Sequence, residues 1–332
     1  MKKILTLLLT TVLLGLTACT PTIENAVTST QNQEISQTEN TSQLPEIPVT
    51  KPTSDRAGNT ISVPVEIEKI LTLAPSITQI AQSMGFSEMI LGIDDYSEGY
   101  LLEPIDNPKI FDMQNPDNET IMTLEPDIIF VTGMSMVEGV NPFQPIIDAG
   151  ICVAEIPSSN SLESIKEDIK FIADCMGTPE KAEIIIDKMD SDIAEIKAIG
   201  DTITEKKTIM FEVSAMPYIY SFGSGTFLDE MITLIGAENV FHNEISWIPV
   251  SEESALAANP DVILTSIYYL DDPEGEILSR AGWEAVTAVK NKAVHRFDSD
   301  QTDIPNQFIT EALYEMAKFV YPEQYAEVEY SE

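Results

Sequence analysis

The sequence predicts an α/β protein with two lobes, each built around a mostly parallel sheet, joined by a single long helix. Short apolar segments alternate with helical patterns along most of the chain, which is typical of parallel strands covered by helices. One phrase also occurs twice: Glu119 and Glu253 are each followed seven residues later by Pro-Asp and an apolar run. The two copies lie too far apart for a solenoid repeat, so they indicate two equivalent lobes.

The first lobe is expected to open with a hairpin turn at Gly58-Asn59 and a short strand near residues 61–65. Its further strands are predicted at residues 70–73, 90–93, 128–132 and 152–156, because continuous apolar runs are typical of strands buried on both faces. The intervening helices are predicted from Pro75 to Met84-Gly85, from Glu119, and at residues 142–149. Residues 94–97 read as an exposed loop.

The helical patterns in the middle of the chain are unusually long. Residues 161–176 are helical, Gly177-Thr178-Pro179 interrupts them, and a second helix extends to about residue 199. Thr178 as N-cap, Pro179 in the first turn and Gly200 after the end mark its boundaries. A helix of about 20 residues spans about 30 Å, so we expect a stiff connection between the lobes. Its predicted buried stripe is Ala182, Ile185, Ile186, Met189, Ile193 and Ile196.

The second lobe repeats the alternation, with strands predicted at residues 208–213 and 262–266 and a helix at residues 227–235. The glycine-rich residues 223–226 before that helix could bind a ligand oxygen at the helix N-terminus. They lack the lysine of a phosphate loop, so we interpret them as a tight turn. Residues 243–249 have no regular pattern, and Trp247 lies among polar neighbours there, which favours a pocket over a core position.

The N-terminus predicts export. Lys2-Lys3, an apolar stretch and a small residue before Cys19 form a signal peptide over residues 1–18, too short to span a bilayer. Cys19 stands where a bacterial lipobox places its lipidated cysteine, although an ordinary signal peptide with an incidental cysteine is the alternative. Residues 19–53 then form a lipidated, disordered tether. We expect an extracytoplasmic protein anchored to the cytoplasmic membrane by lipid alone, at the cell surface in a Gram-positive bacterium. The predicted first lobe spans residues 54–160, the connecting helices 161–200, and the second lobe 201–332.

The formal net charge of −37, from 18 basic and 55 acidic residues, excludes nucleic acid as a partner. A solvated acidic surface accounts for most of it. The sequence holds no G-x-S-x-G, H-E-x-x-H or P-loop motif and no Cys/His nucleophile pair, so we expect neither an enzyme nor a resident cofactor. With His242 and His295 as its two histidines, the chain does not fit a bare zinc or manganese receptor. A disulfide between Cys152 and Cys175 is one alternative, but we expect both to be buried free thiols.

Four stretches in this order, together with the lipobox, resemble the helical-backbone class (class III) of substrate-binding proteins, which serve ABC importers of cobalamin, ferric siderophores and haem. The likeness is nearest to the cobalamin branch, through Tyr96-Ser97, Glu119 and residues 247–253, and it extends over residues 54–322. Met113 stands where that branch tends to carry a tryptophan. The stretches are residues 70–78 (ILTLAPSIT), 124–129 (LEPDII), 236–241 (GAENVF) and 247–253 (WIPVSEE).

The resemblance implies two Rossmann-like lobes joined by a backbone helix, a monomer, and an ABC permease dimer with its ATPase as partner. It also implies that Glu119 and Glu253 dock into basic pockets on the two permease subunits. Two carboxylates held apart on a rigid body can seat against such a partner in fixed register. The alternative is that each acid complements its own helix dipole, with Asn118 and Ser251 as caps. The matched spacing of the two phrases favours docking.

The ligand is expected in the cleft at the carboxyl ends of the strands. Because cations are scarce, cobalamin or a neutral or cationic ferric hydroxamate suits this cleft better than an anionic catecholate or citrate chelate. Haem remains a further alternative with His242 as axial candidate, although a surface position is expected for it. A sensing or adhesive lipoprotein without a permease is the alternative of a different class. The candidate ligand-binding residues are Tyr96, Met113, Met134, Met136, Tyr218, Phe222, Trp247, Tyr268, Tyr269 and Arg280.

Overall fold

The computed structural model describes residues 50–330, apart from residue 138 and the side chains of residues 299 and 301. The predicted signal peptide, Cys19 and most of the predicted tether lie outside the described residues, so these predictions stay untested. All the described residues belong to one compact unit, Pro48–Glu332. Within the described part, no helix has the length and apolar character needed to cross a membrane.

The first sheet has five parallel strands in the order β3-β2-β1-β4-β5. The central strands β1 and β4 are buried at every residue, as their apolar runs predicted. The chain builds outward from β1 to β3 and then places β4 on the other side of β1. The carboxyl ends of β1 and β4 therefore border the crevice where sheets of this kind bind ligands. The strands are β1 (Ile70–Leu73), β2 (Ile90–Asp94), β3 (Lys109–Phe111), β4 (Ile128–Thr132) and β5 (Cys152–Ile156).

The helices of the first lobe follow the predicted alternation, and two local predictions fail. Residues 61–65 form no strand, because Pro64 cannot donate to a ladder and Val65 is exposed. The predicted loop at residues 94–97 is only partly exposed: Asp94 and Ser97 are buried and hydrogen-bond to each other. The helices are α1 (Pro75–Ser83), α2 (Asn118–Leu124), α3 (Gln144–Asp148) and α4 (Leu162–Met176), with short 3-10 turns η1 (Ser87–Met89), η2 (Ser97–Gly99) and η3 (Gly133–Ser135).

The second sheet has four parallel strands in the order β11-β10-β6-β8, and β7 pairs with β9 in a separate antiparallel ribbon. Both main sheets are thus parallel and the fold is α/β, as predicted. The strands are β6 (Thr208–Glu212), β7 (Tyr220–Phe222), β8 (Glu238–Asn239), β9 (Trp247–Pro249), β10 (Val262–Thr265) and β11 (Val294–Arg296). The helices are α6 (Phe227–Leu234), α7 (Glu252–Ala258), α8 (Pro273–Leu278), α9 (Thr287–Asn291), α10 (Ser299–Asp303) and α11 (Ile309–Val320).

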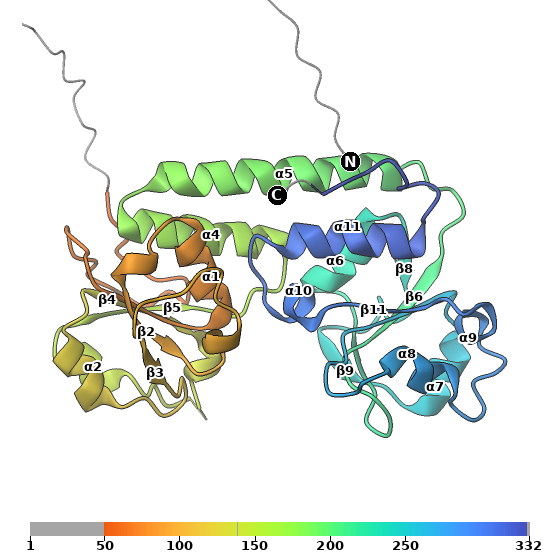
Figure 1. Ribbon diagram of the computed structural model, residues 1–332, viewed down its shortest axis with the longest axis horizontal. Coiled ribbons are helices and arrows are strands. Elements are labelled where there is room, and N and C mark those ends of the chain that lie inside the picture. Colours follow the sequence, from red (N-terminus) through yellow and green to blue (C-terminus); the bar gives the residue numbers. More distant parts are fainter. Residues whose placement is uncertain (1–49, 138, 331–332) are drawn as a thin grey trace, which may run out of the picture. The chain divides into compact units, whose positions relative to one another are not determined.

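The long helix α5 (Pro179–Gly200) packs against α4 of the first lobe and against α6 and α11 of the second (Figure 1). Met189 and Ile196 of the predicted stripe are buried there. Thr178 is the N-cap, as predicted, although its side chain makes no capping hydrogen bond. Gly200 differs from its prediction: it is the last helical residue, and an added Cβ would meet the Leu234 carbonyl oxygen at 2.1 Å. Glycine is needed here because the backbones of α5 and α6 approach closely, and not because the helix ends at a left-handed residue.

The Pro-Asp of the repeated phrase has the same structural role in both lobes. Asp127 accepts hydrogen bonds from the backbone N–H groups of Glu68 and Lys69 at 2.8 and 2.9 Å, just before β1. Asp261 accepts from the backbone N–H and the hydroxyl of Thr208, both at 2.9 Å, at the start of β6. Each aspartate therefore fastens the start of the neighbouring parallel strand and satisfies backbone donors that the sheet leaves unpaired.

Candidate binding pocket and docking helices

A pocket of about 610 Å³ lies between the carboxyl-end loops of the first sheet and three segments of the second lobe. This volume falls within the range of about 300–1,000 Å³ that is usual for small-molecule sites. Ala74 and Pro75 follow β1 and Thr132 ends β4, so the pocket opens at the switch point of the strand order. The second lobe contributes Phe227, Trp247 and residues 302–305.

Four of the predicted ligand-binding residues line this pocket: Tyr96, Met113, Met134 and Trp247. Tyr96 and Met134 are 63% and 60% exposed, so large apolar surfaces remain open to a ligand. Trp247 is 43% exposed and meets the ring of Phe222 edge-on, with 5.6 Å between centroids. The pocket thus brings together aromatic and methionine side chains from both lobes.

Six predicted residues do not line the pocket, and three of them, Phe222, Met136 and Arg280, pack into other parts of the protein. Phe222 is fully buried in the core and supports Trp247 from behind instead of facing the ligand space. Met136 packs against the apolar core of the first lobe and lines a different hollow. Arg280 is the third, and its position is the largest departure from the sequence interpretation.

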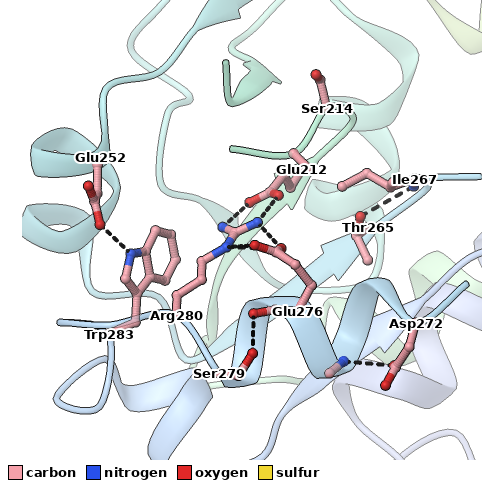
Figure 2. A network of polar contacts seen from close by, with 12 residues as sticks. Glu212, Ser214, Glu252, Thr265, Ile267, Asp272, Glu276, Ser279, Arg280 and Trp283 are labelled. Atoms are coloured by element: carbon pink, nitrogen blue, oxygen red, sulfur yellow. Dashed lines mark hydrogen bonds and ion pairs between the residues drawn. The ribbon is translucent and has the colours of Figure 1, made fainter. Parts of the chain in front are cut away.

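Arg280 is the centre of a buried ion-pair cluster in the second lobe (Figure 2). Its guanidinium donates to Glu212 at 2.8 Å (Nη1–Oε2) and to Glu276 at 3.0 Å, and its side chain is 3% exposed. Burial would lower the pKa of Arg280, but the hydrogen bonds that it donates to Glu212 and Glu276 outweigh this effect and raise that pKa. Glu212 is fully buried and therefore needs this counter-charge, which removes Arg280 from the cleft.

The remaining predicted residues are exposed but do not line the pocket. Tyr218 and Tyr268 are 81% and 70% exposed, and Tyr269 accepts a hydrogen bond from the Ala215 N–H at 2.8 Å. His242 also lies outside the pocket, where its Nδ1 faces the buried carboxylate of Asp229 at 2.9 Å. It is therefore not placed to act as an axial ligand in this pocket.

The acidic part of the pocket wall was not identified from the sequence. Asp95, Asp112, Asp168 and Asp303 line it, and no lysine, arginine or histidine is among the described lining residues. Asp95 and Asp112 directly follow the carboxyl ends of β2 and β3, so the rule that placed the cleft there could have found them. Asp303 lies at the end of α10, in a segment without a readable pattern.

These carboxylates differ in their neighbours. Asp168 receives a hydrogen bond from Arg56 at 2.7 Å and another from Ser159, so its charge is compensated. Asp95, Asp112 and Asp303 form no ion pair within the described residues. The side chain of Asp303 is exposed, but the protein around it partly desolvates the carboxyl and raises its pKa to about 6. The pocket therefore presents uncompensated negative charge near neutral pH.

The two predicted docking glutamates occupy equivalent places. Glu119 lies in the first turn of α2 and Glu253 in the first turn of α7; both are exposed, and neither side chain has a partner among the described residues. Ser251 caps α7 as predicted, since its hydroxyl accepts the Ser254 N–H at 3.1 Å. Asn118 is not the cap of α2: Asp117 caps it, and Asn118 is its first residue.

Cys152 and Cys175 are buried free thiols, as expected. Burial raises the pKa of Cys152 to about 11, which makes it unreactive near neutral pH. In the described part of the chain, no cluster of three or more His, Cys, Asp or Glu side chains has the arrangement to hold a metal ion.

Two curated relatives cover most of the chain. The uncharacterized ABC transporter substrate-binding lipoprotein YvrC of Bacillus subtilis is 29% identical over 276 residues, which is 82% of this chain and 86% of the relative. The vitamin B12-binding protein of Vibrio parahaemolyticus is 25% identical over 257 residues, covering 76% of this chain and 89% of that protein.

Among solved structures, a possible iron-binding (periplasmic solute-binding) protein from Staphylococcus epidermidis superposes with a TM-score of 0.68 at 25% identity, covering 77% of this chain and 99% of that one. The family model described as periplasmic binding protein matches residues 70–301, which is more than half of the sequence. The two parallel sheets, the long helix and the pocket between the lobes agree with that match. The chain therefore belongs to the periplasmic binding protein family.

Proposed function

We propose that this chain is an extracytoplasmic lipoprotein that captures a metal-chelate ligand, with a corrinoid favoured, and delivers it to an ABC importer permease. One observation carries the proposal: the pocket is lined from both lobes by aromatic and methionine side chains and acids, and by no described cation. In this role the protein binds its ligand without covalent chemistry, and Cys19 anchors it to the membrane.

The charge of the pocket ranks the ligands. Asp95, Asp112 and Asp303 repel a catecholate or citrate chelate, which carries several negative charges, and they attract a neutral chelate with a cationic metal centre or a cationic chelate. The corrin macrocycle of cobalamin also offers apolar surface to Tyr96, Met134 and Trp247. Similarity to a vitamin B12-binding protein supports the same ligand class.

A ferric hydroxamate is the second candidate, because it is also neutral or cationic and therefore suits an acidic pocket. The chain is in addition similar to a possible iron-binding protein. Haem is less favoured, since its two propionates are anionic and no described lysine or arginine lines the pocket. A surface lipoprotein without a permease is the alternative of another class, and it would leave Glu119 and Glu253 without a role.

Tryptophan fluorescence tests the ligand. A chain beginning at Pro48 is titrated in parallel with cobalamin, a ferric hydroxamate, a ferric catecholate and haem. Saturable quenching by cobalamin is expected, and it should be strongly reduced in Trp247→Phe, because the other tryptophan, Trp283, is fully buried outside the pocket. Tighter binding of the catecholate than of cobalamin would contradict the charge argument.

Uptake tests the docking. Replacing both glutamates, Glu119→Ala with Glu253→Ala, should abolish ligand uptake by cells while the ligand affinity of the purified protein stays unchanged. The matched control is Glu125→Ala, which removes an exposed acid at the other end of α2. Normal uptake in the double variant would exclude the docking role.

A further inference from the structure

We propose that Glu252 and Asn118, the residues immediately before the two docking glutamates, are positioning residues that hold the docking helices at a fixed orientation. The inference rests on the proposed docking role of Glu253 and Glu119. It assigns a purpose to the polar network in Figure 2, which the ligand pocket does not use.

In the second lobe, the anchor is a hydrogen bond from a buried indole. Trp283 is fully buried, and its Nε1–H donates to Oε1 of Glu252 at 3.0 Å (Figure 2). The guanidinium carbon of Arg280 lies 4.8 Å from the indole centroid, and Glu212 and Glu276 hold Arg280 in place. The first residue of α7 is thereby tied to the core of the lobe, because a buried indole N–H requires an acceptor.

This tie fixes the direction of the next side chain. Adjacent residues on an α-helix point about 100° apart, so turning Glu252 toward the core turns Glu253 toward solvent. The helix α7 has seven residues, and helices shorter than about 12 residues depend on tertiary contacts for their stability. Without the Trp283 hydrogen bond, the first turn of α7 would be held by its Ser251 cap and apolar packing alone.

The first lobe reaches the same arrangement with different chemistry. Asn118 is the first residue of α2, and its Nδ2 donates to the Pro142 carbonyl oxygen at 3.0 Å. The next residue, Glu119, is exposed, as Glu253 is. The helix α2 also has seven residues and ends, like α7, at a left-handed residue. Two unrelated anchors at one equivalent position indicate a shared requirement for a defined Glu119–Glu253 geometry.

Spin-label distance measurement tests the positioning directly and without a ligand. Labels are attached at Glu119→Cys and Glu253→Cys in the chain beginning at Pro48, where the native cysteines are buried. The distance distribution should broaden in Glu252→Leu and in Trp283→Phe, which remove opposite partners of one hydrogen bond. It should stay narrow in Glu252→Gln, which keeps the acceptor oxygen. An unchanged distribution in both disruptive variants overturns the proposal.

Uptake by cells carrying the full chain then tests the consequence, with radiolabelled cobalamin as the probe. Glu252→Leu should lower uptake roughly three- to tenfold, as expected for loss of one buried hydrogen bond. For Glu252→Gln, the ligand affinity and the melting temperature should match those of the wild type. In a Glu253→Ala background, Glu252→Leu should cause no further loss. An equal further loss there would show a merely structural role and overturn the proposal. If the wild type takes up no cobalamin, the proposed ligand fails, and the spin-label result still decides the positioning.

Discussion

At the scale of single residues, neighbours decide what each acid in the pocket can do. Asp168 and Asp303 both line the cavity, but Arg56 and Ser159 compensate Asp168 while Asp303 receives a hydrogen bond from the Thr302 hydroxyl and has no ion pair within the described residues. An aspartate side chain is therefore part of a structural ion pair at position 168, whereas at position 303 it adds negative electrostatic potential to the pocket.

The pKa of Asp303, about 6, predicts pH-dependent ligand affinity. Raising the pH from 5 to 7 ionises the carboxyl, so affinity for a cationic chelate such as aquacobalamin should increase over this interval. Affinity for neutral cyanocobalamin should change much less, and Asp303→Asn should flatten the aquacobalamin profile. Fluorescence titrations at each pH provide the measurement. A profile of the same slope in Asp303→Asn would mean that another group controls it.

The same residue predicts a pH-dependent stability. The folded-state pKa of Asp303 is raised by burial, so the folded protein binds this proton more tightly than the unfolded chain does. Its contribution to stability is complete below the usual pKa of an aspartate and is lost as the pH rises to about 6. Asp303→Asn should therefore reduce the decrease in melting temperature between pH 4 and pH 6. Identical melting curves of variant and wild type across that interval would contradict this.

At the scale of elements, the repeated phrase combines a structural role of its aspartates with the docking role proposed for its glutamates, which the sequence could not separate. The aspartates fasten strand starts, whereas the side chains of the glutamates eight residues earlier form no hydrogen bond or ion pair among the described residues. The spacing between them is set by the length of a short helix and by the residues that end it. Glu125 and Asn259, with φ of 51° and 45°, end α2 and α7 directly before the prolines.

Substitutions within the phrase should separate these functions. Asp261→Ala should lower the free energy of unfolding by about 1–3 kcal/mol, because the Thr208 N–H loses its side-chain acceptor. Glu253→Ala in the same phrase should leave stability unchanged within about 0.5 kcal/mol, since surface substitutions generally do. Urea denaturation of both variants is the measurement, and equal destabilisation would argue against the division of roles.

The end of α5 offers a test of close packing between elements. Gly200→Ala should lower the free energy of unfolding by about 1–3 kcal/mol or more, because the new Cβ would meet the Leu234 carbonyl oxygen at 2.1 Å. Gly99→Ala is the matched control: a Cβ there meets nothing within 4 Å and its φ is not positive. Thermal denaturation should distinguish the two. An unchanged melting temperature in Gly200→Ala would mean that α5 and α6 can move apart without loss of stability.

At the scale of the whole Pro48–Glu332 unit, side-chain hydrogen bonds join the two lobes in addition to the connection through α5. Asn306 donates to the Gln79 side chain, and Gln307 donates to the Ser83 hydroxyl at 2.6 Å. Gln79 in turn donates to the carbonyl oxygen of Tyr100, which lines the pocket. The contacts that join the lobes are thus continuous with the ligand site.

These ties and the helical connection predict little closure on binding. Small-angle scattering should show a change in radius of gyration below about 1 Å when ligand saturates the protein, as in other preorganised binders. Gln79→Ala combined with Gln307→Ala removes both ties and should increase the change. A large contraction of the wild type would instead indicate a hinge.

The sequence by itself determined the fold class, the course of the central strands, the long helix and the repeated glutamates. These follow from local patterns: apolar runs, helical periodicity, capping residues and fixed spacing. It also identified four pocket residues: Tyr96, Met113 and Met134 follow strands whose carboxyl ends meet at one edge, and Trp247 lies among polar neighbours.

The tertiary structure alone decided which side chains face the ligand. Arg280 was expected in the cleft and is instead buried against Glu212, 68 residues away in the sequence. Phe222 became a support for Trp247, and Asp303 entered the pocket from a segment without a pattern. Burial and pairing depend on residues that meet only after the chain has folded, and so does the charge on the pocket wall.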